Sequence, residues 1–131
     1  MTEPRKLTLS LVGDTFAIAR MSPADDFPDW AFTGAFASVT RTEDEVSIVC
    51  PENSVPAGVM HEGGWRCLGV IGELDFSLAG VISSLAGPLA AVAVPIFLIS
   101  TYDSDYLLVK ADRLERAVGA LSEAGHTVTV G

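Results

Sequence analysis

The chain has 131 residues, of which 49% are hydrophobic, so it can bury the core of one domain or of two small domains. Its 17 acidic and 8 basic residues give a formal net charge of −9, which argues against nucleic acid and anionic membranes as partners. Cys50 and Cys67 have no CxxC spacing and no neighbouring histidine. We therefore expect buried thiols in a reducing cytoplasm, with no zinc site and no disulfide framework.

The first part of the chain predicts strands joined by irregular segments. Leu7–Val12 alternates apolar and hydroxyl side chains, as a half-exposed strand does, and Phe16–Met21 continues it. The prolines and aspartates of Ser22–Trp30 predict a loop. Ala35–Thr40 and Glu45–Cys50 flank a polar turn, so we expect them to pair as a hairpin.

The middle of the chain predicts a short helix and then a longer strand. Asn53–Met60 has Asn53 or Ser54 as a candidate cap and a proline in its first turn, which favours a helix. The sequence HEGG at His61–Gly64 should then break the chain. From there, Trp65–Leu74 has the pattern of a strand.

The segment Phe76–Tyr102 carries no charged residue and is long enough to span a bilayer. Glycines and prolines interrupt it, and acidic residues rather than Lys or Arg flank both ends. We therefore interpret it as a helix over Ser77–Leu89 followed by a buried strand. The apolar face of this helix is predicted to consist of Leu78, Ile82, Leu85 and Leu89.

The last part of the chain predicts a hairpin, a helix and a final strand. Val94–Ser100 and Tyr106–Lys110 form the hairpin, and Asp112 should cap the helix with Glu115 at the capping-box position. Gly125 should end that helix, and the following segment His126–Val130 (HTVTV) alternates as a strand does. The buried stripe of the helix that Asp112 caps is predicted to consist of Leu114, Ala117, Val118 and Leu121. The second half of the chain therefore predicts the order β-α-β-β-α-β.

Functional side chains gather in the turn of that hairpin, Thr101–Asp105 (TYDSD). Its hydroxyls and carboxylates can bind the ammonium or hydroxyl groups of a ligand, although a solvated hairpin tip would have the same composition. His61 and His126 are expected at the surface. Without a nucleophile–base pair, a phosphate-binding glycine loop or metal-ligand spacing, the sequence predicts neither an enzyme nor a cofactor.

The chain also contains a weak internal repeat. A shift of 60 residues aligns Val39–Val49 (VTRTEDEVSIV) with Ile99–Val109 (ISTYDSDYLLV), and it places Glu45 on Asp105. Chance similarity between two hairpins is the alternative. The repeat predicts two related units, of which the first has the loop Ser22–Trp30 where the second has a helix.

Two segments carry a resemblance to a known family: LDFSLAGVISSLAGPLAAVAVPIF at Leu74–Phe97 and ISTYDSDYLLVKADRL at Ile99–Leu114. They resemble the ACT domains of the CASTOR-type family, which binds amino acids and includes the animal arginine sensors. The resemblance covers about residues 35–130. It implies an α+β fold of tandem ACT units, each a ferredoxin-like βαββαβ unit with an antiparallel sheet. A degenerate first unit would occupy residues 1–63 and an ACT domain residues 64–131.

The resemblance also implies a ligand site. Its hairpin contacts fall on Thr101, Tyr102 and Asp105, and its ligand loop consists of Asp75, Phe76, Ser77, Leu78, Ala79, Gly80 and Val81. The chemistry agrees, because a helix N-terminus offers backbone N–H groups to a carboxylate, Gly80 permits close approach, and Asp105 suits an ammonium. Asp75 and Ser77 are equally good as helix caps. Leu78 stands where the arginine sensors have an acidic residue, so the identity of the amino acid stays open.

The function that the resemblance implies is regulation rather than catalysis. We expect a cytoplasmic homodimer, paired side by side, that binds a free amino acid or similar small ligand and acts on a partner protein. The alternative is a ligand-free protein–protein interaction module with the same fold.

Overall fold

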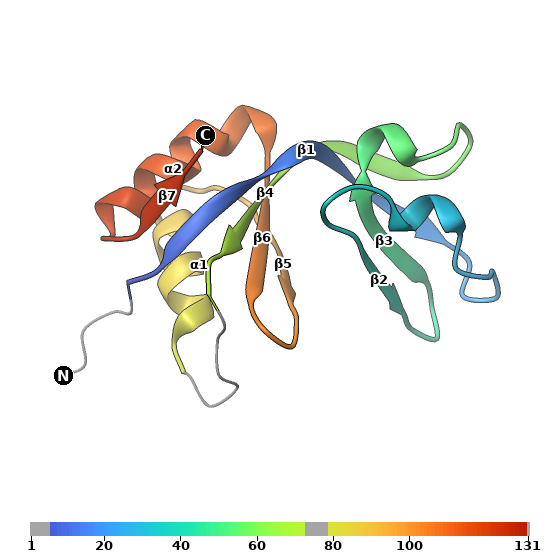
Figure 1. Cartoon of the computed structure of the whole chain (residues 1–131), viewed down its shortest axis with the longest axis horizontal. Coiled ribbons are helices and arrows are strands. Elements are labelled where there is room, and N and C mark those ends of the chain that lie inside the picture. Colours follow the sequence, from blue (N-terminus) through green and yellow to red (C-terminus); the bar gives the residue numbers. More distant parts are fainter. Residues whose placement is uncertain (1–5, 73–78, 131) are drawn as a thin grey trace. The chain divides into compact units, whose positions relative to one another are not determined.

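The computed structural model describes residues 6–72 and 79–130, so the predicted ligand-loop residues Asp75, Phe76, Ser77 and Leu78 lie outside the described residues. The chain divides into two compact units (Figure 1). Unit 1 consists of Met1–Leu11 and Arg66–Gly131, and unit 2 of Val12–Trp65. Strands β1 (Thr8–Met21) and β4 (His61–Val70) run through both units. The predicted domains, 1–63 and 64–131, differ from this division mainly in the first eleven residues.

Unit 2 is a sheet without an α-helix. Its strands lie in the order β2-β3-β1-β4, with β2 at Ser38–Arg41 and β3 at Val46–Pro51. The predicted hairpin is confirmed, because β2 and β3 pair antiparallel, and β3 pairs antiparallel with β1. Two short 3-10 helices, η1 (Asp29–Phe32) and η2 (Glu52–Ser54), complete the unit. The loop predicted at Ser22–Trp30 is thus confirmed except for the start of η1.

The predicted helix over Asn53–Met60 is wrong, and so is the predicted break at His61–Gly64. Only the short helix η2 forms, because Val55 is already extended and Gly58 has a φ of +91°. The two glycines of HEGG belong to β4 instead. A Cβ at Gly63 would collide with the side chain of Glu52, whose Oε1 accepts a 3.0 Å hydrogen bond from the Gly64 N–H. These glycines therefore let β4 begin directly against Glu52.

Unit 1 has the predicted order β-α-β-β-α-β. After β4 come α1 (Val81–Ala91), β5 (Phe97–Ser100), β6 (Asp105–Lys110), α2 (Leu114–Glu123) and β7 (Thr127–Thr129). The sheet order is β7-β1-β4-β6-β5, and β7 pairs with β1 in parallel while β5 and β6 pair antiparallel. β1 therefore separates β7 from β4, which places the start of the chain inside the sheet of its C-terminal unit.

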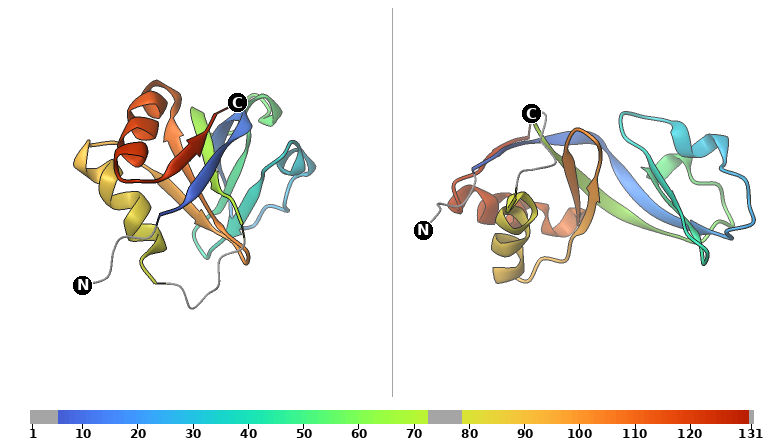
Figure 2. Two further views of the ribbon diagram at one scale, coloured as in Figure 1. Left: turned by 60° about the vertical axis from the view of Figure 1, so that its left-hand side comes forward. Right: turned by 90° about the horizontal axis from the view of Figure 1, so that it is seen from below.

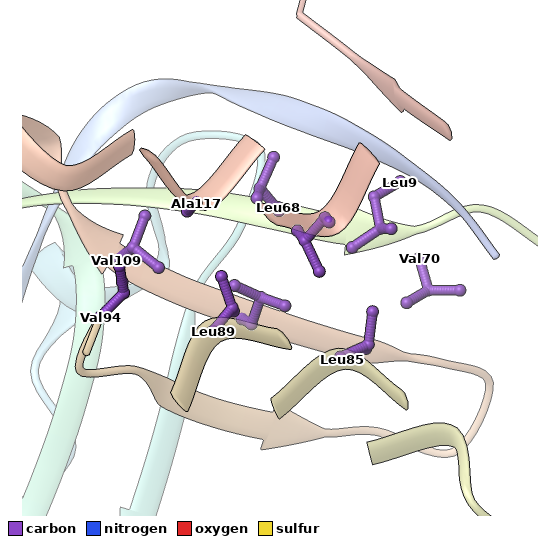
Figure 3. Packing of buried hydrophobic residues seen from close by; sticks show 10 residues of the cluster. Leu9, Leu68, Val70, Leu85, Leu89, Val94, Val109 and Ala117 are labelled. Atoms are coloured by element: carbon purple, nitrogen blue, oxygen red, sulfur yellow. The ribbon is translucent and has the colours of Figure 1, made fainter. Parts of the chain in front are cut away.

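Both helices of unit 1 pack on one face of its sheet (Figures 1 and 2). Figure 3 shows side chains from β1, β4 and β6 meeting those of α1 and α2 in one core. Leu85 and Leu89 are buried there as predicted, but Ile82 is 43% exposed and Val81 is buried in its place. The buried stripe of α1 runs at i, i+4 and i+8 from Val81, which leaves Ile82 on the outer side.

Helix α2 differs from the prediction at its N-terminal end and agrees with it at its C-terminal end. Asp112 lies in the 3-10 helix η3 (Ala111–Arg113), and Arg113 at the N-cap makes no side-chain cap hydrogen bond, so the predicted capping box is wrong. Gly125 ends the helix as predicted, with a φ of +100°. Ala117 and Leu121 are fully buried on the predicted stripe. His126, expected at the surface, is only 5% exposed.

Candidate functional site

The hairpin turn between β5 and β6 is fixed by its own hydroxyl groups. The Thr101 N–H donates to the Ser104 carbonyl at 2.8 Å, and the Thr101 hydroxyl accepts from the Ser104 N–H at 3.2 Å. The Ser104 hydroxyl, which is buried, donates to the Val70 carbonyl at 2.8 Å. The turn is thereby held against the C-terminal end of β4, where the chain leaves toward α1.

The hairpin of unit 2 has the same turn. The Thr42 N–H donates to the Glu45 carbonyl at 2.8 Å, and the Thr42 hydroxyl accepts from the Glu45 N–H at 3.1 Å. Thr42 thus corresponds to Thr101 and Glu45 to Ser104, so the turns align at an offset of 59 residues and not 60. The predicted match of Glu45 with Asp105 is therefore wrong.

With the corrected offset, Asp105 occupies the position that Val46 holds in unit 2. Val46 is fully buried in the core, and Asp105 is 9% exposed. Its carboxylate accepts a short hydrogen bond from the hydroxyl of Ser100, its cross-strand partner in β5. Because side chains alternate along β6, Asp105 shares the helix-covered face with Leu107 and Val109, which belong to the core. A carboxylate at a core position is costly without a polar partner, which makes Asp105 a candidate functional residue.

The N-terminus of α1 is formed around Gly80. Gly80 is the N-cap residue with a φ of +82°, and the helix has no side-chain cap hydrogen bond. The hydroxyls of Ser83 and Ser84 donate to carbonyls of the first turn, at Gly80 and Val81. The N-cap residue Gly80 has no side chain to accept from the backbone N–H groups at this end. Ala79 and Gly80 are exposed, whereas Val81 is buried in the core.

These two segments lie at the same end of unit 1. In Figures 1 and 2 the start of α1 and the turn between β5 and β6 point the same way, beyond the C-terminal end of β4. Three apolar side chains are exposed on these elements: Ile71 after β4, Ile82 on α1 and Tyr102 in the turn, with exposures of 56%, 43% and 79%. The arrangement therefore offers a helix N-terminus, a buried carboxylate and apolar side chains.

Of the predicted site residues, the structure places Thr101 and Asp105 in or beside the turn held against β4. Thr101 uses its hydroxyl within the turn, and Tyr102 projects into solvent. Neither Ser100 nor Ile71 was predicted to belong to this region. Ser100 could have been found from the hairpin itself, because a four-residue turn makes it the cross-strand partner of Asp105.

Other kinds of site find no support among the described residues. No group of three or more His, Cys, Asp or Glu side chains in residues 6–72 and 79–130 could hold a metal ion. Cys50 and Cys67 are buried free cysteines, as predicted, and burial raises the pKa of the Cys67 thiol to about 12. That thiol is protonated at neutral pH and is a poor nucleophile. None of the described helices is long and apolar enough to cross a membrane.

Two family models match the chain, each over a different part. The ACT domain model matches residues 60–123, and a model described as an N-terminal domain matches residues 14–58. The first match covers most of unit 1 from β4 onward, and the second lies within unit 2. The β-α-β-β-α-β order of unit 1 agrees with the ACT domain that the first model describes.

Similar proteins agree with this class. The cytosolic arginine sensor for mTORC1 subunit 1 of Bos taurus is 34% identical over 95 residues, which are 66% of this chain and 29% of the sensor. The chain spans less than a third of the length of the curated relatives it matches. The regulatory subunit of aspartate kinase from Thermus flavus has a TM-score of 0.64 at 12% identity, with 92% of this chain and 99% of that chain covered. At that identity the likeness shows the fold alone.

A crystal structure of protein Atu0741 from Agobacterium tumefaciens is similar over nearly the whole chain. It is 36% identical with a TM-score of 0.92, and 97% of this chain and 95% of that chain are covered. The chain belongs to the same family as this Agobacterium protein.

Proposed function

We propose that the protein is a non-catalytic ACT regulator of the cytoplasm, which binds a free amino acid and acts as a homodimer on a partner protein. It is built from tandem ACT-like units, of which unit 2 is degenerate because it lacks both helices. The similarity to an arginine sensor and to a regulatory subunit of aspartate kinase supports a regulatory role. The observation that carries the ligand site is the buried carboxylate of Asp105 at a core-facing position.

The proposed ligand is held by its two charged poles. Its α-carboxylate binds backbone N–H groups at the N-terminus of α1, which also carries the positive end of the helix dipole. Its ammonium binds the carboxylate of Asp105, which Ser100 orients. The exposed apolar side chains of Ile71, Ile82 and Tyr102 suit an apolar side chain on the ligand better than a cationic one. We therefore expect an apolar amino acid to bind more tightly than arginine.

A second candidate function is a ligand-free interaction module. The same three apolar side chains are exposed at one end of unit 1, and exposed apolar surface is typical of protein contacts. In this function the carboxylate of Asp105 would serve only the hairpin, through Ser100.

A thermal-shift screen of the twenty amino acids on the full chain separates these functions. A ligand that binds only the folded state at about a hundred times its Kd stabilises it by about 2.7 kcal/mol, which raises Tm by several degrees. We expect at least one amino acid to give such a shift. Asp105→Asn should abolish the shift, because the neutral amide loses the charge-assisted bond to the ammonium.

Asp103→Asn is the matched control, because Asp103 lies in the same turn but is exposed. This variant should keep the full shift, since it changes the charge of the turn without changing the buried carboxylate. If none of the twenty amino acids shifts Tm, the ligand-free module becomes the better explanation. If Asp105→Asn and wild type shift equally, an amino acid binds elsewhere.

A further inference from the structure

His126 joins three elements of unit 1 although it lies outside the proposed ligand site. It follows Gly125 at the end of α2 and directly precedes β7. Its Nδ1 accepts a 3.0 Å hydrogen bond from the backbone N–H of Leu7, just before β1. Its Nε2 lies 2.8 Å from the backbone carbonyl of Ser84 in α1. The ring is 5% exposed, so water does not compete freely for either bond.

The bond to Ser84 is explained by a proline in the helix. Within an α-helix, the carbonyl of Ser84 would accept from the N–H of residue 88, but Pro88 has none. That carbonyl is therefore open to another donor, and the Nε2–H of His126 reaches it. A partly buried carbonyl without a donor is costly, so the imidazole replaces the hydrogen bond that Pro88 cannot make.

The two partners fix the protonation state of the ring. A backbone N–H can only donate, so Nδ1 must carry a lone pair, and a carbonyl can only accept, so Nε2 must carry the proton. Only the neutral imidazole protonated at Nε2 satisfies both. A second proton on Nδ1 would point at the Leu7 N–H, and one of the two groups would have to leave. We propose that His126 is a proton-sensitive latch that holds β1 and β7 to α1 when neutral and releases them when charged.

Within residues 6–72 and 79–130, no acid on the elements that pack around His126 favours the charged ring. α1, β7 and the part of β1 in unit 1 contain no titratable residue, as their sequences show. Lys6 precedes β1, and its side chain lies against Gly125, close enough to collide with a Cβ there. Its positive charge opposes a second cation at His126. On α2, Glu115, Arg116 and Glu123 are exposed to solvent, which screens them.

Release of the latch affects the β1–β7 pairing first. The Thr127 N–H donates to the Leu7 carbonyl at 2.9 Å, next to the Leu7 N–H that binds His126. Loss of the histidine bond therefore frees Leu7, which lies directly before the parallel pairing of β1 with β7 and accepts the first hydrogen bond from β7. A second proton on His126 is compatible with the unfolded chain but not with both of its hydrogen bonds, so in the proposed latch acid favours unfolding or local opening of this edge. This effect needs no ligand, so it is independent of the proposed amino-acid site.

The test is urea unfolding of the full chain from pH 7.5 to 5.5, a range in which histidine is the side chain that normally titrates. The unfolding equilibrium constant of wild type should rise by up to about tenfold per pH unit below pH 6.5, as expected for one proton. His126→Asn keeps an acceptor oxygen for Leu7 but cannot be charged, so most of this dependence should disappear. His61→Asn is the control, because the chain has only two histidines and His61 is exposed. It should behave as wild type.

An equal pH dependence in wild type and His126→Asn would overturn the proposal, and so would its loss in His61→Asn alone. If His126→Asn does not fold, imidazole ¹⁵N NMR of wild type still decides. We expect one histidine in the Nε2–H form at pH 7.5, whose ring becomes charged only when its bonds to Leu7 and Ser84 are lost. A ring protonated at Nδ1 at pH 7.5, or a His126 ring that becomes charged while the β1–β7 pairing stays intact, would contradict the latch.

Discussion

Asp105 is the residue whose burial most conflicts with its chemistry. We predict that Asp105→Val, which copies Val46 of unit 2, raises the free energy of unfolding by about 1–3 kcal/mol while abolishing amino-acid binding. The carboxylate is 9% exposed and faces the core, whereas its hydrogen-bond donor, Ser100, is exposed and can return to water. Urea unfolding at pH 7 measures the first effect, and the thermal-shift response measures the second.

The matched control is Asp103→Val on the exposed part of the same turn. It should change the free energy of unfolding by less than about 0.5 kcal/mol, as is usual for surface sites. A variant Asp105→Val that is less stable than wild type would mean that the bond to Ser100 stabilises the hairpin by more than the buried charge costs. The functional interpretation of Asp105 would then lose its main support.

At this scale the sequence indicated which residues to consider but not how they are placed. The polar turn was evident from its composition, yet an offset of 60 residues aligned the buried Asp105 with Glu45, which is only partly buried. Because side chains alternate along a strand, an error of one residue moves a side chain to the opposite face of the sheet. The corrected offset of 59 pairs Thr42 with Thr101 and Asp44 with Asp103, and the matching hydrogen bonds of the two threonines establish it.

At the scale of elements, both helices of unit 1 end in the same hydrogen-bonded motif. The Val94 N–H donates to the Leu89 carbonyl at 3.0 Å, and the His126 N–H donates to the Leu121 carbonyl at 3.0 Å. Each motif requires a residue with positive φ before the last donor. α2 has Gly125 there, but α1 has Ala93 with a φ of +57°.

We predict that Ala93→Gly stabilises the protein by about 0.5–1 kcal/mol, because glycine adopts the left-handed conformation without the steric cost of a Cβ. Gly125→Ala should lower the free energy of unfolding, because alanine is strained at this positive φ and its methyl group would collide with the Lys6 side chain. Urea unfolding of both variants checks the pair. A destabilised Ala93→Gly would mean that the entropy which glycine adds to the unfolded chain exceeds the relieved strain.

The elements themselves were largely predictable from sequence, whereas their ends were not. Alternation found β1, and the spacing of Leu85 and Leu89 found α1, because hydrophobic periodicity reflects burial directly. The HEGG segment was misjudged because glycine usually ends strands. Here Gly63 and Gly64 are accommodated within β4 by contact with Glu52, which lies in another part of the chain. Local propensity contains no information about such a contact.

At the scale of the whole molecule, long-range pairing was the part that sequence reasoning missed. The pairing of β7 with β1 joins the two ends of the chain, and neither strand has a pattern that specifies its neighbour. The burial of His126 follows from that pairing, because Leu7 supplies one of its two hydrogen bonds. From sequence alone His126 was therefore predicted to lie at the surface, because nothing in the alternating strand beside it indicates the hydrogen bond from Leu7.

The sheet edges lead to the prediction of a homodimer. β5 lies at one end of the strand order in unit 1, with the short strand β7 at the other, and β2 lies at an end in unit 2. An edge strand presents backbone N–H and carbonyl groups that a second chain can pair. We place the contact at β5, next to the turn that carries the proposed site. Light scattering at tens of micromolar should give about twice the 13.8 kDa of one chain, and a monomeric mass would rule the dimer out.

Charged residues on an edge strand prevent pairing, so the two edges can be told apart by matched substitutions. Ile99 is partly buried in β5, on the face opposite the helices, and Thr40 is exposed in β2. Ile99→Lys should give monomers at the concentration where wild type is dimeric, because a charge would have to be buried at the new strand pair. Thr40→Lys should remain dimeric. If Thr40→Lys alone gives monomers, the chains pair through unit 2, and the proposed ligand site lies away from the dimer contact.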